Sequence, residues 1–179
     1  METSTATPSW IGLARSGLQL LLPIAMVLTS VRLLLTEVFV RLEYSSPGFP
    51  TDRYGFTTDD RTHHAGIALD YLLNSAGIEF LGDQRFANGA PVYNERELQH
   101  MEDVKRVTQS TLKVGWVGVG LVLGLRLLIW QVAGGRPALE SLRAGSRLTA
   151  ILMIVLGTGL VVGFAVVFVG FHQVFFPPG

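Results

Sequence analysis

The sequence predicts a mainly α-helical membrane protein, a transmembrane helix bundle with a small, mostly helical extracytoplasmic domain between its first and second spans. Hydrophobic residues make up 49% of the 179 residues and charged residues only 16%, which is unlike an ordinary soluble domain. The charges are clustered and leave three long apolar stretches. Each stretch has about the 20 residues that a helix needs to cross the hydrocarbon layer.

The three apolar stretches define the expected spans. The first, residues 17–40, is interrupted near its outer end by Arg32, which we expect to reach the interface or to hold a lipid headgroup or an oxyanion. The second span is residues 113–133, with Arg126 inside it. The third, residues 148–171, carries no charge.

Charges in the connections predict the orientation. Residues 134–147 hold three arginines against one acid, and Arg15 lies in residues 1–16, so both segments are expected in the cytoplasm. Residues 41–112 and the end at 172–179 are then extracytoplasmic. In agreement, residues 41–113 carry eight basic and eleven acidic side chains.

The outer segment is expected to hold two helices. Prolines and a glycine keep residues 45–50 extended or in a turn. A helix capped by Thr58 or Asp59 is expected to run to about Ser75. Residues 77–93 contain short β-like pieces at 78–80 and 91–93, which predict a hairpin.

The second helix of the outer segment opens with a capping box. Asn94 and Glu97 have the spacing at which each side chain binds the other's backbone amide. Apolar residues then recur at near-helical spacing, so we expect this helix to continue into the second span.

Composition excludes several kinds of site. The chain has no cysteine, which excludes disulfides, thiolate nucleophiles and cysteine zinc sites. The net charge is zero, with no basic excess to favour a nucleic-acid partner. No cofactor is expected. Glycines in the second and third spans are interpreted as helix-packing surfaces; they are Gly115, Gly118, Gly120, Gly124, Gly157, Gly159 and Gly163.

Two histidines are the strongest candidates for chemistry. On a helix, Glu97 and Asp103 share a face with His100, and a neighbouring carboxylate can orient an imidazole. His172 follows the uncharged third span, where a titratable group is costly without a task. A down-and-up pair of spans would return His172 to the level of His100. The alternative is that both rings are amphipathic side chains at the headgroup level.

His63 and His64 are a weaker candidate. Each lies four residues after an aspartate, Asp59 or Asp60, so each pair shares a helix face and has groups that bind metals. A third ligand at metal spacing is not evident. A solvated helix start is the favoured interpretation, and no metal site is expected.

Three stretches together resemble a known family. They are Tyr54-Gly55-Phe56-Thr57 with Asp60-Arg61 and Tyr71-Leu72, the stretch from Asn94 to Lys105, and Phe171-His172-Gln173-Val174-Phe175-Phe176. In order and in position relative to the spans, they resemble the Lit-type lipoprotein intramolecular transacylases, which are bacterial integral membrane proteins. Members typically continue past the paired phenylalanines into a fourth helix, so the resemblance implies a four-helix bundle of which this chain carries three helices.

The resemblance implies an activity and a site. Enzymes of this family move the sn-2 acyl chain of a lipoprotein's diacylglyceryl-cysteine to the α-amine of that cysteine, giving a lyso-form lipoprotein. The expected partners are a diacylated lipoprotein and membrane lipid, at the outer side of the bacterial cytoplasmic membrane. His100 and His172 match the family's catalytic pair. Substrate-binding or supporting candidates are Arg32, Tyr54, Arg61, Glu97, Asp103 and Phe175.

Two other functions fit the same residues. One is hydrolysis of a lipid ester at the membrane interface by the two histidines. The other is a non-catalytic membrane subunit whose outer domain binds a partner. A pore or carrier is disfavoured, because the spans hold few polar groups.

Overall fold

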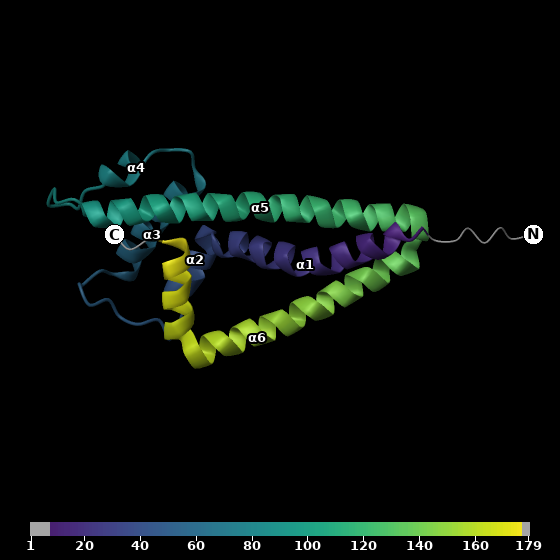
Figure 1. Cartoon of the computed structure of the whole chain (residues 1–179). Coiled ribbons are helices and arrows are strands. Elements are labelled where there is room, and N and C mark those ends of the chain that lie inside the picture. Colours follow the sequence, from purple (N-terminus) through teal and green to yellow (C-terminus); the bar gives the residue numbers. More distant parts are fainter. Residues whose placement is uncertain (1–7, 177–179) are drawn as a thin grey trace, which may run out of the picture. The chain divides into compact units, whose positions relative to one another are not determined.

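The computed structural model describes residues 8–176, which form six α-helices and no strand (Figure 1). The long helices are α1 (Trp10–Leu34), α5 (Glu95–Ala133) and α6 (Gly135–Phe175), and each is long and apolar enough to cross a membrane. The short helices are α2 (Glu37–Tyr44), α3 (Thr58–Leu73) and α4 (Glu79–Gly82). The prediction of a mainly α-helical membrane protein with three spans is confirmed. Parts of the expected terminal segments, residues 1–7 and 177–179, lie outside the described residues.

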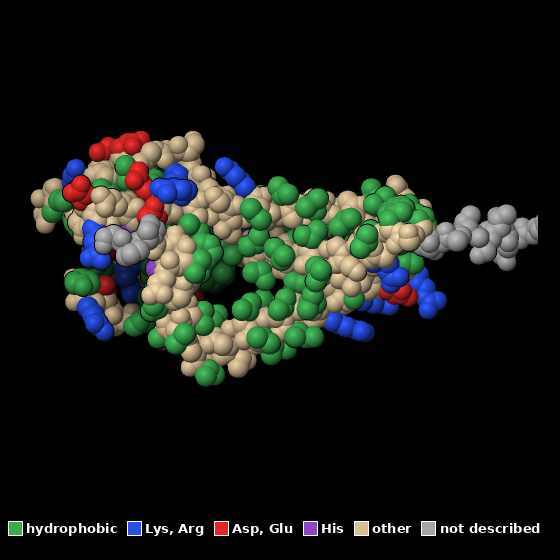
Figure 2. All heavy atoms as spheres, in the orientation of Figure 1, with side chains coloured by type: hydrophobic (Ala, Val, Ile, Leu, Met, Phe, Trp, Pro, Cys, Tyr) green, Lys and Arg blue, Asp and Glu red, His purple; other side chains and the backbone are tan. Residues whose placement is uncertain are grey.

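The chain divides into two compact units, and α1 and α5 each run through both. One unit comprises residues 1–29 and 113–179, and the other comprises residues 30–112. The first unit holds the apolar helices, and along them hydrophobic side chains cover the visible face while Lys and Arg gather beside the turn from α5 into α6 (Figure 2). The second unit holds the short helices and most of the polar sequence.

Small residues bring the helices of the first unit together. The buried core contains Leu18, Ile129 and Ala138, one from each long helix. A Cβ at Gly145 would lie 2.9 Å from Leu22 Cδ2 and 3.3 Å from the Cα of Gln19, so α6 touches α1 there with no space for a side chain. Close packing of this kind is typical of helices in membranes.

The glycines expected to pack between helices divide into two groups. A Cβ at Gly115 would lie 3.2 Å from Leu28 Cβ, and one at Gly118 would lie 3.5 Å from Ala25 Cβ, as a packing surface requires. The remaining five would meet no atom within 4 Å among residues 8–176, so no neighbouring helix in this part of the chain explains them; they are Gly120, Gly124, Gly157, Gly159 and Gly163.

The segment between the second and third spans is helical. We expected residues 134–147 to form a loop, but α6 begins at Gly135. Gly134 takes a φ of 90°, a conformation that glycine adopts without steric cost, so α5 ends and α6 begins within one residue. The polar contacts of this segment include Arg15, which donates to Ser141 Oγ at 3.2 Å and pairs with Glu140 at 3.2 Å.

Helix α6 bends in its C-terminal half. Gly163 has non-helical dihedral angles, φ −134° and ψ 37°, and the last part of the helix changes direction there (Figure 1). His172 lies in this last part. Glycine allows this kink because, without a Cβ, its backbone can adopt dihedral angles outside the helical region.

The first span ends earlier than expected. Helix α1 stops at Leu34, where Arg32 donates to the carbonyl oxygen of Leu35 at 2.7 Å. Thr36 then caps a new helix, since its side chain accepts from the amide of Phe39 at 3.2 Å. Residues 37–40 therefore belong to α2, because the threonine satisfies an amide that would otherwise remain unpaired at the helix start.

Helix α3 starts with a capping box one residue before the expected caps. Thr57 Oγ1 accepts from the amide of Asp60 at 3.1 Å, and Asp60 Oδ2 accepts from the amide of Thr57 at 2.9 Å. The prediction of Thr58 or Asp59 as the cap is wrong. Thr57 is favoured because Asp60 lies at the third helical position, where its carboxylate can reach back.

The expected hairpin at residues 77–93 is largely wrong. Glu79–Gly82 form α4, in which Leu81 is completely buried, so the β-like piece at 78–80 is partly helical. What remains is an isolated bridge between Arg85 and Pro91 around a turn at Gly89, whose φ is 82°. Alternation over three residues is too short to separate a strand from a helical turn.

Helix α5 carries the expected capping box and the expected continuation. Asn94 Oδ1 accepts from the amide of Glu97 at 3.0 Å, and Glu97 Oε2 accepts from the amide of Asn94 at 2.9 Å. The helix runs for 39 residues, from Glu95 to Ala133, which confirms that it continues into the second span. This continuity attaches the helix bearing His100 directly to a membrane span.

Two side chains of α5 hold the end of α3. Lys105 Nζ donates to Asn74 Oδ1 at 3.1 Å and to the carbonyl oxygen of Ala76 at 2.6 Å, and lies 4.0 Å from the centre of the Tyr71 ring. Gln109 Nε2 donates to the carbonyl oxygen of Asn74 at 2.8 Å. These bonds satisfy carbonyl groups that the end of a helix leaves unpaired, and Tyr71 beneath them is only 2% exposed.

Candidate functional site

His100 lies in the N-terminal part of α5, in the unit of residues 30–112, and is exposed. The two carboxylates expected to orient it also have partners within α5 and its cap. Glu97 accepts from the amide of Asn94, and Asp103 Oδ1 pairs with Arg106 at 3.2 Å. In this arrangement, therefore, Glu97 and Asp103 stabilise α5 itself.

His172 lies in the last turn of α6, in the unit of residues 1–29 and 113–179. Its Nδ1 is 2.9 Å from the carbonyl oxygen of Phe168. A carbonyl oxygen only accepts, so this contact is a hydrogen bond in the tautomer that carries its proton on Nδ1, and that tautomer leaves Nε2 without a proton. The imidazole centroid lies 4.0 Å from that of Phe168 and 5.3 Å from that of Phe176, so aromatic rings fix its position.

Phe175 is next to this cluster. Its ring centroid lies 4.7 Å from that of Phe171, and it is 49% exposed. Because His100 and His172 belong to different units, their pairing stays a prediction.

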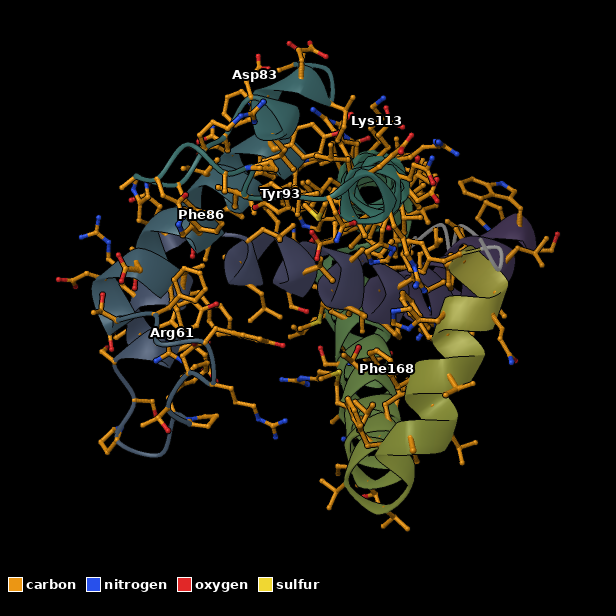
Figure 3. All side chains as sticks on the ribbon, turned by 90° about the vertical axis from the view of Figure 1, so that its left-hand side faces the viewer. Arg61, Asp83, Phe86, Tyr93, Lys113 and Phe168 are labelled. Carbon is orange, nitrogen blue, oxygen red and sulfur yellow. The ribbon has the colours of Figure 1, made fainter. Side chains whose placement is uncertain are left out.

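Arg61 holds the segment between α2 and α3 (Figure 3). Its guanidinium carbon lies 5.4 Å from the centre of the Tyr44 ring and 4.9 Å from that of Phe49, and Nη1 donates to the carbonyl oxygen of Pro50 at 3.0 Å. Cations over aromatic faces are stabilised in this way. Arg61, expected as a supporting residue, therefore holds the segment between α2 and α3.

Tyr54 and Arg32, two other supporting candidates, make different contacts from those of Arg61. Tyr54 is 89% exposed and lies in a turn whose amides at Tyr54 and Phe56 donate to the carboxylate of Asp52. Arg32 donates to Leu35 at the end of α1. The described contacts of both residues are local.

His63 and His64 belong to an aromatic cluster. Their ring centroids lie 5.4 Å apart, and His64 also lies 6.0 Å from Phe56 and 5.7 Å from Phe86. Hydrogen bonds from the side chain and the amide of Thr57 lower the pKa of Asp60, and His64 and His63 lower it further. Within residues 8–176, no three His, Asp or Glu side chains are grouped as a metal would require.

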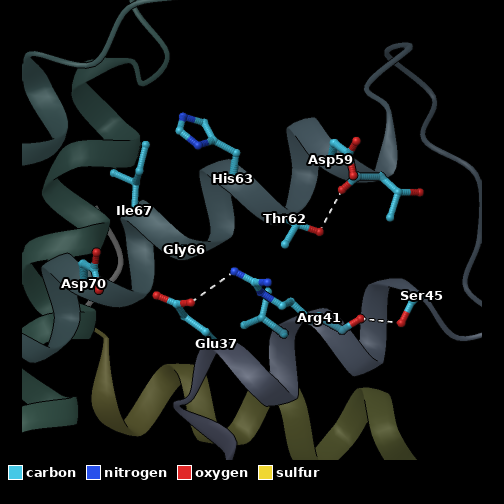
Figure 4. A pocket seen from close by; sticks show the side chains of 11 residues that line it. Glu37, Arg41, Ser45, Asp59, Thr62, His63, Gly66, Ile67 and Asp70 are labelled. Carbon is cyan, nitrogen blue, oxygen red and sulfur yellow. Dashed lines mark hydrogen bonds and ion pairs between the residues drawn. The ribbon is translucent and has the colours of Figure 1, made fainter.

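A pocket of about 690 Å³ lies between α2 and α3, within the unit of residues 30–112 (Figure 4). Helix α2 contributes Glu37, Val40 and Arg41, and Ser45 follows it. Helix α3 contributes a face at helical spacing, consisting of Thr58, Asp59, Thr62, His63, Gly66, Ile67 and Asp70. Glu37 and Asp70 are seen at one end of the pocket and Ser45 and Asp59 at the other (Figure 4).

Sequence reasoning did not identify this pocket or the Lys105 contacts. Two signals were present, namely Thr36-Glu37 as a helix start and the polar face of α3 that repeats at 59, 63 and 70. Neither signal says which helix faces another. The partners of Lys105 are 29 and 31 residues away in the chain, beyond the range of a local pattern.

One comparison with known proteins identifies a family. The family model of lipoprotein intramolecular transacylase Lit matches residues 17–178. An uncharacterised protein of Aquifex aeolicus (strain VF5) is 30% identical over 156 residues, which cover 83% of this chain and 66% of that relative. No solved structure matches the chain. A family match over residues 17–178, which contain all three apolar helical regions, leads to one conclusion: the chain belongs to the Lit family of lipoprotein intramolecular transacylases.

Proposed function

We propose that this protein transfers an acyl chain within one diacylated lipoprotein, from the sn-2 oxygen of the diacylglyceryl group to the α-amine of the N-terminal cysteine. The observation that carries the proposal is the family match over residues 17–178, which include His100 and His172. The proposed product is a lyso-form lipoprotein with an amide-linked chain. The proposed location is the bacterial cytoplasmic membrane, with the reaction on its outer face.

The reaction needs proton transfer and little else from the protein. The ammonium gives a proton to a base, its nitrogen attacks the ester carbon, and a tetrahedral oxyanion forms whose nitrogen still carries two protons. The carbon–oxygen bond to glycerol then breaks, the nitrogen gives up its second proton, and the glycerol oxygen takes up one proton, so that one proton is released overall. Because donor and acceptor belong to one molecule, holding them close removes much of the entropic barrier.

Two imidazoles are suited to these proton transfers. The hydrogen bond of His172 Nδ1 to Phe168 supports Nε2 as the base that deprotonates the ammonium. We assign to His100 the complementary role of stabilising the oxyanion and protonating the glycerol oxygen. The mechanism requires no serine or cysteine nucleophile, in keeping with a chain that has no cysteine.

The position of the histidines in the sequence supports a shared reaction face. His100 precedes the apolar part of α5, and His172 follows the apolar part of α6. A chain that crosses a membrane twice returns to the face from which it started. Ester groups of membrane lipids lie near the headgroups, the level that both histidine-bearing segments are proposed to reach.

The test is mass spectrometry of a lipoprotein's N-terminal peptide from cells that express the wild type, His100→Gln, His172→Gln or His64→Gln. We expect the wild type and His64→Gln to give the amide-linked lyso form. His100→Gln and His172→Gln should each form the lyso form about 10²–10⁴-fold more slowly, which is the usual contribution of general acid–base catalysis.

Three other outcomes would contradict the proposal. Loss of one chain without an amide would identify a lipid ester hydrolase. Normal processing by both His100→Gln and His172→Gln, at normal protein levels, would identify a non-catalytic subunit. An equal loss in His64→Gln would mean that the histidines act through folding.

A further inference from the structure

The pocket between α2 and α3 has an excess of negative charge. Its lining carries the carboxylates of Glu37, Asp59 and Asp70 against the guanidinium of Arg41, and it also includes the imidazole of His63. Arg41 Nη2 pairs with Glu37 at 3.4 Å, so its charge is partly neutralised inside the pocket. The carboxylates of Asp59 and Asp70 make no hydrogen bond or ion pair with any other residue in the described part of the chain.

Two hydroxyl groups of the lining, those of Ser45 and Thr62, are oriented as acceptors. Ser45 Oγ donates to the carbonyl oxygen of Arg41 at 2.6 Å, and Thr62 Oγ1 donates to that of Thr58 at 2.8 Å. A hydroxyl has one proton to give, so toward a ligand these two oxygens can only accept. The pocket thus presents carboxylates and hydroxyl acceptors together, which fits a positively charged, donor-rich ligand.

The size and position of the pocket favour a peptide. About 690 Å³ is typical of a site for a ligand of many atoms and exceeds the needs of one ammonium group. Glu37, at its edge, follows Leu34, the last residue of the apolar helix α1, by three positions. A chain segment leaving a lipid anchored in the membrane would emerge near the end of such a span.

We propose that this pocket binds the peptide segment following the lipidated cysteine of the substrate, and that Asp59 and Asp70 favour segments bearing lysine or arginine. The inference rests on the proposed function, because it takes the lipoprotein as the ligand. It adds a substrate preference that the two histidines do not supply.

Gly66 provides a way to fill the pocket. It lies on the lining face of α3, and a Cβ there would meet no described atom within 4 Å. Gly66→Leu therefore places a larger side chain in the space, and replacing a glycine in a helix does not oppose folding. Gly66→Ala is its control, since it adds only the Cβ.

The test measures binding and needs no turnover. Two fluorescent diacylglyceryl-cysteinyl peptides with the same lipid, one continuing Ser-Lys-Lys-Lys-Lys and the other Ser-Glu-Glu-Glu-Glu, are titrated with the full chain in dodecylmaltoside micelles. By fluorescence anisotropy, we expect the wild type to bind the lysine peptide about three- to tenfold more tightly, the range for two solvent-accessible charge pairs.

The variants decide whether the preference belongs to the pocket. Asp59→Asn/Asp70→Asn and Gly66→Leu should bring the affinity ratio close to one. The matched control Glu43→Gln/Asp83→Asn removes two exposed carboxylates outside the pocket, and should keep the ratio, as should Gly66→Ala. A ratio unchanged in the pocket variants, or equally lost in the controls, would overturn the proposal.

Two further measurements separate the alternatives. If phosphatidylethanolamine added to the micelles displaces the lysine peptide from the wild type, the pocket takes a lipid headgroup and the peptide assignment is overturned. Amide formation is assayed in the same samples. A binding preference without amide product contradicts the proposed reaction and leaves the pocket assignment standing. Amide product without a binding preference overturns the pocket assignment and leaves the proposed reaction standing.

Discussion

At the scale of single residues, satisfying the backbone decides what several polar side chains do. Glu97 shares a helix face with His100, yet its carboxylate accepts from the amide of Asn94. Amides at a helix start have no intrahelical partner, so a nearby carboxylate is drawn to them. For His172, the contact of Nδ1 with the carbonyl oxygen of Phe168 has a chemical consequence, because it favours the tautomer that leaves Nε2 without a proton.

Thr57 gives a prediction at this scale. Thr57→Ala removes the acceptor for the amide of Asp60 and the hydroxyl bonded to Asp60 Oδ2 at 2.6 Å. Loss of a threonine N-cap should speed hydrogen exchange at the start of α3 about fivefold at neutral pH. Exchange of the full chain in detergent, followed by mass spectrometry, measures this. Thr58→Ala, the neighbouring threonine, should change little.

The same site predicts a dependence on pH. Hydrogen bonds from Thr57 lower the pKa of Asp60 below its ordinary value of 3.8. A carboxyl group with a lowered pKa in the folded state stabilises that state above its unfolded pKa, and the stabilisation is lost as the pH falls through the folded pKa. Protection at the start of α3 should therefore fall below about pH 4. An equally steep fall in Thr57→Ala would contradict this assignment.

At the scale of helices, boundaries depend on caps and glycines more than on hydrophobicity. The apolar pattern of the first span continues past Leu34, but Thr36 starts a second helix there. Gly134 joins α5 and α6 without a loop, and Gly163 bends α6 before His172. One residue in each case redirects a segment that hydrophobicity alone would treat as continuous.

Gly145 tests the packing of α6 against α1. In Gly145→Val, the new Cβ would lie 3.2 Å from Leu22 Cβ as well as close to Gln19, so the helices must separate. Overpacking of this kind costs about 1–3 kcal/mol. The midpoint of SDS-induced unfolding in mixed micelles should fall accordingly. Gly159→Val, whose Cβ meets no described atom within 4 Å, should change the midpoint little, and an equal fall in both would exclude a specific contact.

At the scale of the whole molecule, orientation is the property on which the proposed reaction depends. The arginines between the second and third spans predict that residues 134–147 face the cytoplasm. Residues 41–112, with His100, are then outside. The proposed substrate is presented on that side, so a reversed orientation would separate the histidines from it.

The absence of cysteine makes orientation easy to measure, because one introduced thiol is then the only one. Ala87 and Ser146 are both exposed. Ala87→Cys should react with a membrane-impermeant maleimide in intact cells, and Ser146→Cys should react only after the membrane is disrupted. The opposite pattern would contradict the outward placement of His100.

The sequence by itself determined the class of the protein, its three spans and the continuous helix that carries His100. These follow from the length of apolar stretches and from local capping, which act whatever the rest of the chain does. It also carried the three stretches that resemble the family, and the family match over residues 17–178 confirms the membership.

Only the tertiary structure decided the contacts between distant segments. The pocket requires that α2 faces α3. Lys105 binds groups at the end of α3 that lie 29 and 31 residues away in the chain. Gly145 is important because α1 approaches it closely. A periodic pattern shows which face of a helix is polar or apolar, but which element covers that face depends on the packing of the whole fold.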